Sequence, residues 1–110
     1  MSYRVILNER AEGQLEAAYL WWLEQRSPEQ ATRWYNGFLD ALDALRELPE
    51  RFGVARESPK FPYSVRELLY GVGSSVTHRA LFTIPHDIVF VFSIRHLAQK
   101  DVSPDMDMSP

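Results

Sequence analysis

One segment near the end of the chain is apolar on both of its faces. It reads Ile88-Val89-Phe90-Val91-Phe92, an unbroken run of β-branched and aromatic residues that is typical of a buried strand. Because side chains alternate between the two faces of a sheet, both faces of this strand must be covered. We therefore expect a central strand with neighbours at its sides and a layer on each face.

Two further strands are expected before this one. The three strands cover residues 63–70, 76–84 and 87–95, and turn-forming residues at 71–75 and 85–87 separate them. Connections this short join antiparallel neighbours, since parallel strands need a long crossover.

The first half of the chain has helical spacing. After a short strand at residues 3–7, Asn8 can cap a helix that runs to about Arg26. Ser27-Pro28-Glu29-Gln30 then combines an N-cap, a proline at the first helical position and a capping box. The second helix ends near Leu48-Pro49. So short a break predicts an antiparallel helical hairpin.

The element order β-α-α-β-β-β indicates an α+β fold, in which the helical hairpin packs on one face of a small, mostly antiparallel sheet. Residues 49–63 contain three prolines and no periodicity, which predicts a long exposed loop. We expect a single domain over residues 1–100. The segment 101–110 has no pattern and carries three aspartates, so we expect a disordered acidic tail.

Composition excludes several classes of function. The chain has no cysteine, so disulfides and thiolate metal sites are ruled out, and no motif points to a metal or a cofactor. No apolar run approaches the roughly 18 residues that a membrane span needs, and no signal peptide is evident. We expect a cytoplasmic protein. The net charge of −3 argues against a general nucleic-acid binder, although residues 51–100 carry seven basic and three acidic residues.

Three basic residues on the predicted strands need an explanation. Arg66, Arg79 and His96 lie in or beside apolar segments, where an unpaired cation is costly to bury. Each must meet an acidic partner or a phosphate. Arg66 could instead pair with a helix acid such as Glu16 or Asp40, and Arg79 either emerges into a cleft or has a carboxylate partner. His96 could transfer protons or serve only as a structural hydrogen-bonding residue.

The chain resembles the RelE/ParE superfamily of toxins from bacterial type II toxin–antitoxin modules, which includes plasmid stabilisation proteins. The resemblance covers about 100 residues and depends on the order and spacing of several short pieces. These are Tyr3-Arg4-Val5-Ile6-Leu7, Ser27-Pro28-Glu29-Gln30-Ala31, the segment from Leu45 to Arg51, Val65-Arg66-Glu67-Leu68, His78-Arg79-Ala80-Leu81-Phe82 and Ile94-Arg95-His96.

The resemblance implies three alternatives. A ParE-like toxin inhibits growth by binding a target such as DNA gyrase; a RelE-like toxin is a ribosome-dependent, metal-independent mRNA endoribonuclease; and an inactive relative only binds its antitoxin. The pattern often has an arginine where this chain has Gln99, followed here by Lys100. This departure and the acidic net charge favour the ParE-like reading.

A cognate antitoxin is the partner that the resemblance implies. If the chain is catalytic, Arg66, Arg79 and His96 are the candidate catalytic residues. The candidate partner-binding residues are Arg66, Arg79, Arg95 and Lys100. We expect the antitoxin to cover an edge of the sheet, the groove of the helical hairpin or the basic second half, and the exposed first strand is a natural place for strand addition.

Overall fold

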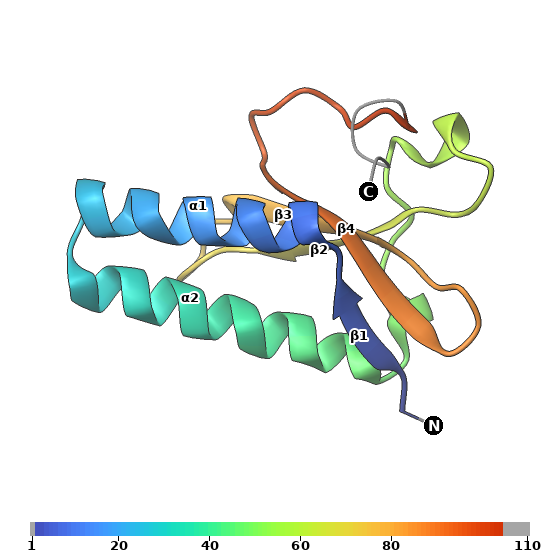
Figure 1. The fold of residues 1–110 in the computed structure, drawn as a ribbon, viewed down its shortest axis with the longest axis horizontal. Helices are drawn as coiled ribbons and strands as arrows, with labels where there is room; N and C mark the ends of the chain where they lie inside the picture. Colours follow the sequence, from blue (N-terminus) through green and yellow to red (C-terminus); the bar gives the residue numbers. More distant parts are fainter. Residues whose placement is uncertain (1, 105–110) are drawn as a thin grey trace.

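The computed structural model describes residues 2–104 (Figure 1). The two helices follow the first strand directly, and the other three strands follow the helices. The elements are β1 (Arg4–Leu7), α1 (Glu9–Gln25), α2 (Pro28–Asp43), β2 (Arg66–Tyr70), β3 (His78–Thr83) and β4 (Ile88–His96). The predicted order of elements is confirmed.

The four strands form one sheet in the order β1-β4-β3-β2. β1 is parallel to β4, whereas β4–β3 and β3–β2 are antiparallel, so the sheet is mostly antiparallel as predicted. The doubly apolar strand β4 lies inside the sheet, with β1 on one side and β3 on the other. Opposite β3, Leu81 faces Ser93 and Phe82 faces Val91, which leaves Phe92 as an extra residue at a bulge.

Both helices begin where their caps predicted. The side chain of Asn8 accepts a hydrogen bond from the Ala11 N–H at 2.8 Å, and Ser27 accepts one from the Gln30 N–H at 3.2 Å. α2 ends at Asp43, earlier than expected, and a 3₁₀ turn at Ala44–Arg46 continues it. The pair of helices lies across one face of the sheet (Figure 1).

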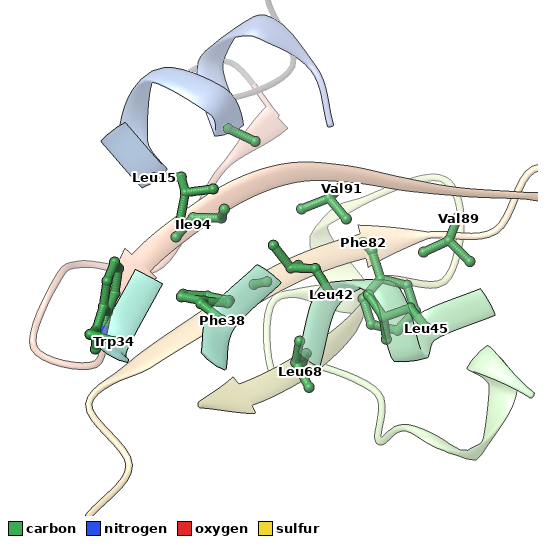
Figure 2. Packing of buried hydrophobic residues seen from close by; sticks show 12 residues of the cluster. Leu15, Trp34, Phe38, Leu42, Leu45, Leu68, Phe82, Val89, Val91 and Ile94 are labelled. Atoms are coloured by element: carbon green, nitrogen blue, oxygen red, sulfur yellow. The ribbon is translucent and has the colours of Figure 1, made fainter. Parts of the chain in front are cut away.

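The larger core fills the space between the helices and the sheet (Figure 2). Trp34, Phe38 and Leu42 from α2 meet Phe82, Val91 and Ile94 from the central strands, and all six are buried. Gly37 leaves room for Tyr70, whose hydroxyl donates a 3.0 Å hydrogen bond to the Trp34 carbonyl; a Cβ at Gly37 would lie 2.2 Å from that hydroxyl oxygen.

The predicted loop at residues 49–63 is irregular chain with two short 3₁₀ turns, but the expectation that it is exposed fails at several positions. This segment crosses the face of the sheet that the helices leave open, and Ala55, Glu57 and Phe61 are buried there. Its backbone pairs with the chain just before and within β2, for example through the Ala55 N–H and the Val65 carbonyl at 2.8 Å. The loop is therefore the second layer that the doubly apolar β4 requires.

The fold also continues beyond residue 100, where the tail was expected to begin. Val102 is fully buried in the smaller core with Ala55, Phe61 and Phe92, and Asp101 forms an ion pair with Arg56 at 2.7 Å. Figure 1 shows this last segment (red) beside the loop of residues 50–62 (yellow-green). Residues 105–110, the rest of the expected tail, lie outside the described residues. Within residues 2–104, no helix is both long enough and apolar enough to cross a membrane.

Candidate functional site

The structure separates the three residues that were candidates for catalysis. Arg66 lies opposite Phe82 in the strand register, whereas His96 lies opposite His78, so the two residues are at opposite ends of the sheet. Arg79 neighbours His78 on β3 and therefore faces away from His96, into the layer formed by the loop and the C-terminal segment. Arg66, Arg79 and His96 do not converge on one substrate position.

Arg79 has the carboxylate partners that were one of its two predicted explanations. Its side chain is 2% exposed and contacts Glu57, which is completely buried, through both terminal nitrogens. Nη1 also donates to Glu67 Oε1 at 2.9 Å. Glu57 Oε2 in turn accepts the Val102 N–H at 3.2 Å. These contacts join the loop, the sheet and the C-terminal segment in one buried ionic cluster, defined here as Glu57, Glu67 and Arg79.

The protonation of the ionic cluster follows from these contacts. Burial alone would raise the pKa of the Glu57 carboxyl, but the hydrogen bonds from Arg79 and from the Val102 N–H outweigh it and lower that pKa. Burial would likewise lower the pKa of Arg79, and the hydrogen bonds to Glu57 and Glu67 reverse the direction. Glu57 and Arg79 are therefore both charged at neutral pH, and the guanidinium is committed to partners within the chain.

Arg66 is held by backbone oxygens, not by the helix acids Glu16 or Asp40. Its Nη1 donates to the Phe52 carbonyl at 2.6 Å and to the Glu50 carbonyl at 3.1 Å. It lines a pocket of about 310 Å³ together with Glu50 and His86. Chiefly the Tyr3 hydroxyl, and to a smaller extent the charge of Arg66, lower the pKa of the Glu50 carboxyl. An incoming phosphate would meet this carboxylate beside Arg66.

The remaining predicted binding residues lie at the His96 end of β4. Arg95 is buried directly opposite Arg79, and its Nη2 donates to the Lys100 carbonyl at 2.8 Å. Lys100 itself is exposed. Gln99, in place of the expected arginine, accepts the His96 backbone N–H at 2.8 Å. Arg95 and Gln99 thus stabilise the turn that follows β4.

His96 belongs to an apolar pocket that the sequence did not indicate. We call it the histidine–tryptophan pocket. It has a volume of about 440 Å³ and is lined by Ala18, Trp21, Trp22, Arg26, Thr77, His78 and His96. The His78 and His96 rings lie edge to face with their centres 5.2 Å apart, because the two residues are paired across β3 and β4. Burial and, secondarily, the proximity of His96 lower the pKa of His78 to about 4.

A second and larger depression follows the helical hairpin on its other side. This hairpin groove has a volume of about 750 Å³ and is lined by Leu7, Glu12, Leu15, Glu16, Tyr19, Leu20, Thr32, Tyr35, Asn36 and Leu39. Its walls are mostly apolar, with two carboxylates from α1. Leu7 is the last residue of the edge strand β1, so the groove and the free edge of the sheet adjoin.

The helical spacing of the aromatic residues indicated a stripe but not two depressions. Tyr19 and Trp22, three residues apart on α1, line different depressions. Their assignment depends on where α2 and the ends of β3 and β4 meet α1, which periodicity alone does not give. Among residues 2–104, no three His, Asp or Glu side chains gather closely enough to hold a metal ion.

The chain matches a known family over most of its length. The model of the ParE toxin of the type II toxin–antitoxin system parDE matches residues 5–100. The chain belongs to this family. The match covers both helices and all of the sheet except Arg4, so the expected relationship to the RelE/ParE superfamily is confirmed. A search of curated protein sequences finds no match.

Solved structures of related folds agree with the family. One, described as the chromosomal ParDE toxin–antitoxin system from P. aeruginosa, superimposes with a TM-score of 0.68 at 19% identity, over 86% of this chain and 96% of that chain. Another is an arginine double mutant of E. coli toxin RelE in the free state, with a TM-score of 0.53 at 18% identity, over 86% of this chain and 82% of that chain. At these identities the likeness establishes the fold alone.

Proposed function

We propose that this ParE-family toxin inhibits growth by binding a protein target such as DNA gyrase, and that a cognate antitoxin neutralises it. The observation that carries the proposal is the separation of Arg66, Arg79 and His96. Cleavage of RNA at a 2′-hydroxyl requires a base, a cation at the phosphate and an acid within hydrogen-bonding reach of one another. Here the cation with the most acidic surroundings, Arg79, is buried and already paired with two carboxylates.

A RelE-like endoribonuclease is the weaker alternative. Affinity for RNA depends largely on neutralising its phosphates, and this chain has a net charge of −3. Gln99 replaces a cation of the related pattern and is occupied by the His96 N–H. Association with a protein needs neither a phosphate site nor a convergent acid and base, so target binding suits these residues better.

The hairpin groove suits the antitoxin. It offers a long apolar surface between two helices, which is the kind of surface that accepts an amphipathic segment of a partner. Glu12 and Glu16 on its wall favour basic residues at the margin of that segment. Within residues 2–104, β1 pairs with β4 along one edge, and just before β1 the Tyr3 N–H donates to the Arg46 carbonyl at 2.9 Å on the other. The rest of that outer edge, toward Leu7 and the groove, can accept an added strand.

The target is tested with two assays on the purified chain. We expect inhibition of DNA supercoiling by gyrase and no cleavage of mRNA on ribosomes. Intact supercoiling together with cleaved mRNA would reverse the two alternatives. Expression without growth arrest in any host would leave only the third alternative, an inactive relative that binds its antitoxin.

The role of the hairpin groove is tested by measuring the affinity of this chain for the protein that the adjacent gene encodes. Leu39 lies in the groove and is 39% exposed, so Leu39→Glu places a third carboxylate on an apolar wall without changing the core. We expect the dissociation constant to rise at least about tenfold, the size of a typical interface hot spot. Leu69→Glu, at the exposed position of β2, is the matched control. Equal affinities of both variants would exclude the groove.

A further inference from the structure

Four of the seven residues that line the histidine–tryptophan pocket are aromatic. Trp21 and Trp22 meet edge to face at 5.6 Å on α1, and His78 contacts Trp34 at 5.0 Å and His96 at 5.2 Å. Because burial lowers the pKa of His78 to about 4, its ring is neutral at physiological pH and forms an apolar wall. The interior is therefore suited to a flat or branched apolar group.

The polar groups of this pocket are mainly hydrogen-bond donors. The Ala98 N–H donates to His96 Nδ1 at 3.0 Å, so Nδ1 is the acceptor and Nε2 carries the N–H of this ring. Trp22 Nε1–H is buried and has no partner within residues 2–104. Arg26 lies over the Trp21 ring at 5.9 Å. Among residues 2–104, no aspartate or glutamate lines the pocket. A ligand here would meet donors and one positive charge, which favours an acceptor with negative charge.

Exposed apolar side chains belong to the lining of the pocket or to direct neighbours of lining residues. Trp21 is 50% exposed. Val76 directly precedes Thr77 in the sequence, and the Leu97 N–H donates a 2.9 Å hydrogen bond to the Thr77 carbonyl. Val76 and Leu97 are each more than one-third exposed. Tryptophan and arginine around a desolvated pocket are typical of the centre of a protein–protein interface.

We propose that the histidine–tryptophan pocket anchors the protein target of the toxin by receiving an apolar or aromatic side chain that has a carboxylate beside it. This inference depends on the proposed function, because the occupant of the pocket is taken to be a side chain of the toxin's protein target. It adds where on the toxin that target binds and which chemical groups recognise it. The aromatic walls hold the apolar group. Arg26 and His96 Nε2–H are the donors available to the carboxylate.

The proposed target site is separate from the antitoxin groove. The two depressions share no lining residue, yet both use the same helix, and the neighbours Leu20 and Trp21 belong one to each. An antitoxin in the groove would therefore lie directly beside the target pocket on α1. Its bulk could block the target without filling the pocket.

The chemistry of the pocket is tested by nuclear magnetic resonance on the full chain, with N-acetyl-Asp-Phe-amide as the probe. We expect saturable shifts of the Trp21 and Trp22 indole N–H signals, and about tenfold weaker binding of N-acetyl-Lys-Phe-amide, since a charge-assisted hydrogen bond is replaced by repulsion. Equal binding of both dipeptides, tighter binding of adenosine monophosphate, shifts only in the hairpin groove, or shifts that follow protein concentration without a probe would each overturn the proposal.

The role of the histidine–tryptophan pocket in toxicity is tested by the expression level at which each variant arrests growth. Trp21→Ala and Arg26→Glu change exposed side chains, and Leu69→Ala at 51% exposure is the matched control. We expect the first two to raise the expression level needed for arrest at least about tenfold, and the control to leave it unchanged. Full toxicity of both pocket variants overturns the inference while the proposed function stands. Absence of arrest with the unaltered chain overturns the proposed function, and the dipeptide titration then still decides the chemistry of the pocket.

Discussion

The two faces of the sheet are covered in different ways. On one face, two capped helices bury a continuous apolar core around Trp34 and Phe38. On the other, an irregular loop and a short C-terminal segment bury a small apolar core together with the Glu57–Arg79 ion pair. The helices have regular structure and a large apolar contact area. The loop has little regular structure and a small apolar contact area, so its position depends on a few specific contacts.

This difference has an energetic consequence. Apolar contacts are non-directional, so the helix-covered face should lose stability in proportion to the atoms removed. A buried ion pair must overcome the cost of desolvating both charges, and removal of one partner leaves the other uncompensated. The loop-covered face should therefore respond to changes in charge more than to changes in volume.

The largest expected effect is on the helix-covered face. Phe38 is fully buried and stacks on Tyr70 with ring centres 4.6 Å apart. Phe38→Ala should lower the free energy of unfolding by about 4 kcal/mol, measured by urea denaturation. Phe38→Leu keeps most of the volume and should lose far less. Equal losses in the two variants would show that volume does not govern this face.

The next effect separates charge from volume on the loop-covered face. Glu57→Gln preserves size but leaves Arg79 with only the partly exposed Glu67, and should cost about 3 kcal/mol. The double change Glu57→Met and Arg79→Met removes both charges of the buried pair and should recover part of this loss, because Glu67, at 26% exposure, can then be hydrated while the Val102 N–H loses its acceptor. A double variant no more stable than Glu57→Gln would mean that the ion pair itself, and not the uncompensated charge, stabilises the face.

A smaller effect is expected where the C-terminal segment closes this face. Val102 is fully buried, whereas Val76 is 44% exposed. Val102→Ala removes two methyl groups from a packed site and should cost about 2 kcal/mol, and Val76→Ala should cost only a few tenths. Thermal unfolding of both variants compares them directly. Similar losses would show that the segment is not a structural part of the domain.

The same contrast explains what the sequence could and could not predict. The caps at Asn8 and Ser27 and the apolar run at 88–92 were sufficient for both helices and the position of β4, because these signals are local. The covering role of the loop depends on Ala55, Glu57 and Phe61, which have no periodic spacing and acquire meaning only through contacts with Arg79 and Val102.

The candidate site was harder to predict for a related reason. Alternation along a strand assigns only the relative faces of residues on that same strand. Convergence of Arg66, Arg79 and His96 depends instead on strand register, which places Phe82 opposite Arg66 and His78 opposite His96. The two depressions beside α1 arise from packing between segments distant in sequence, and no local pattern encodes them.

The smallest expected effect is a difference between the two faces in how their contributions to the free energy of unfolding depend on pH. The pKa of His78 falls from an ordinary value of 6.5 to about 4, chiefly through burial against the helix-covered core, whereas the lowered pKa of Glu57 belongs to the loop-covered face. Below about pH 6.5 the unfolded chain takes up a proton that folded His78 does not, so the free energy of unfolding should decrease as the pH falls toward 4.

The contribution of Glu57 to the free energy of unfolding should be lost only below pH 4.5, the ordinary pKa of its carboxyl. Between pH 7 and 5 we therefore expect a loss of about 1–2 kcal/mol from His78 alone. His78→Gln cannot titrate and should flatten this dependence in urea denaturation series, and an unchanged slope would assign it to another group.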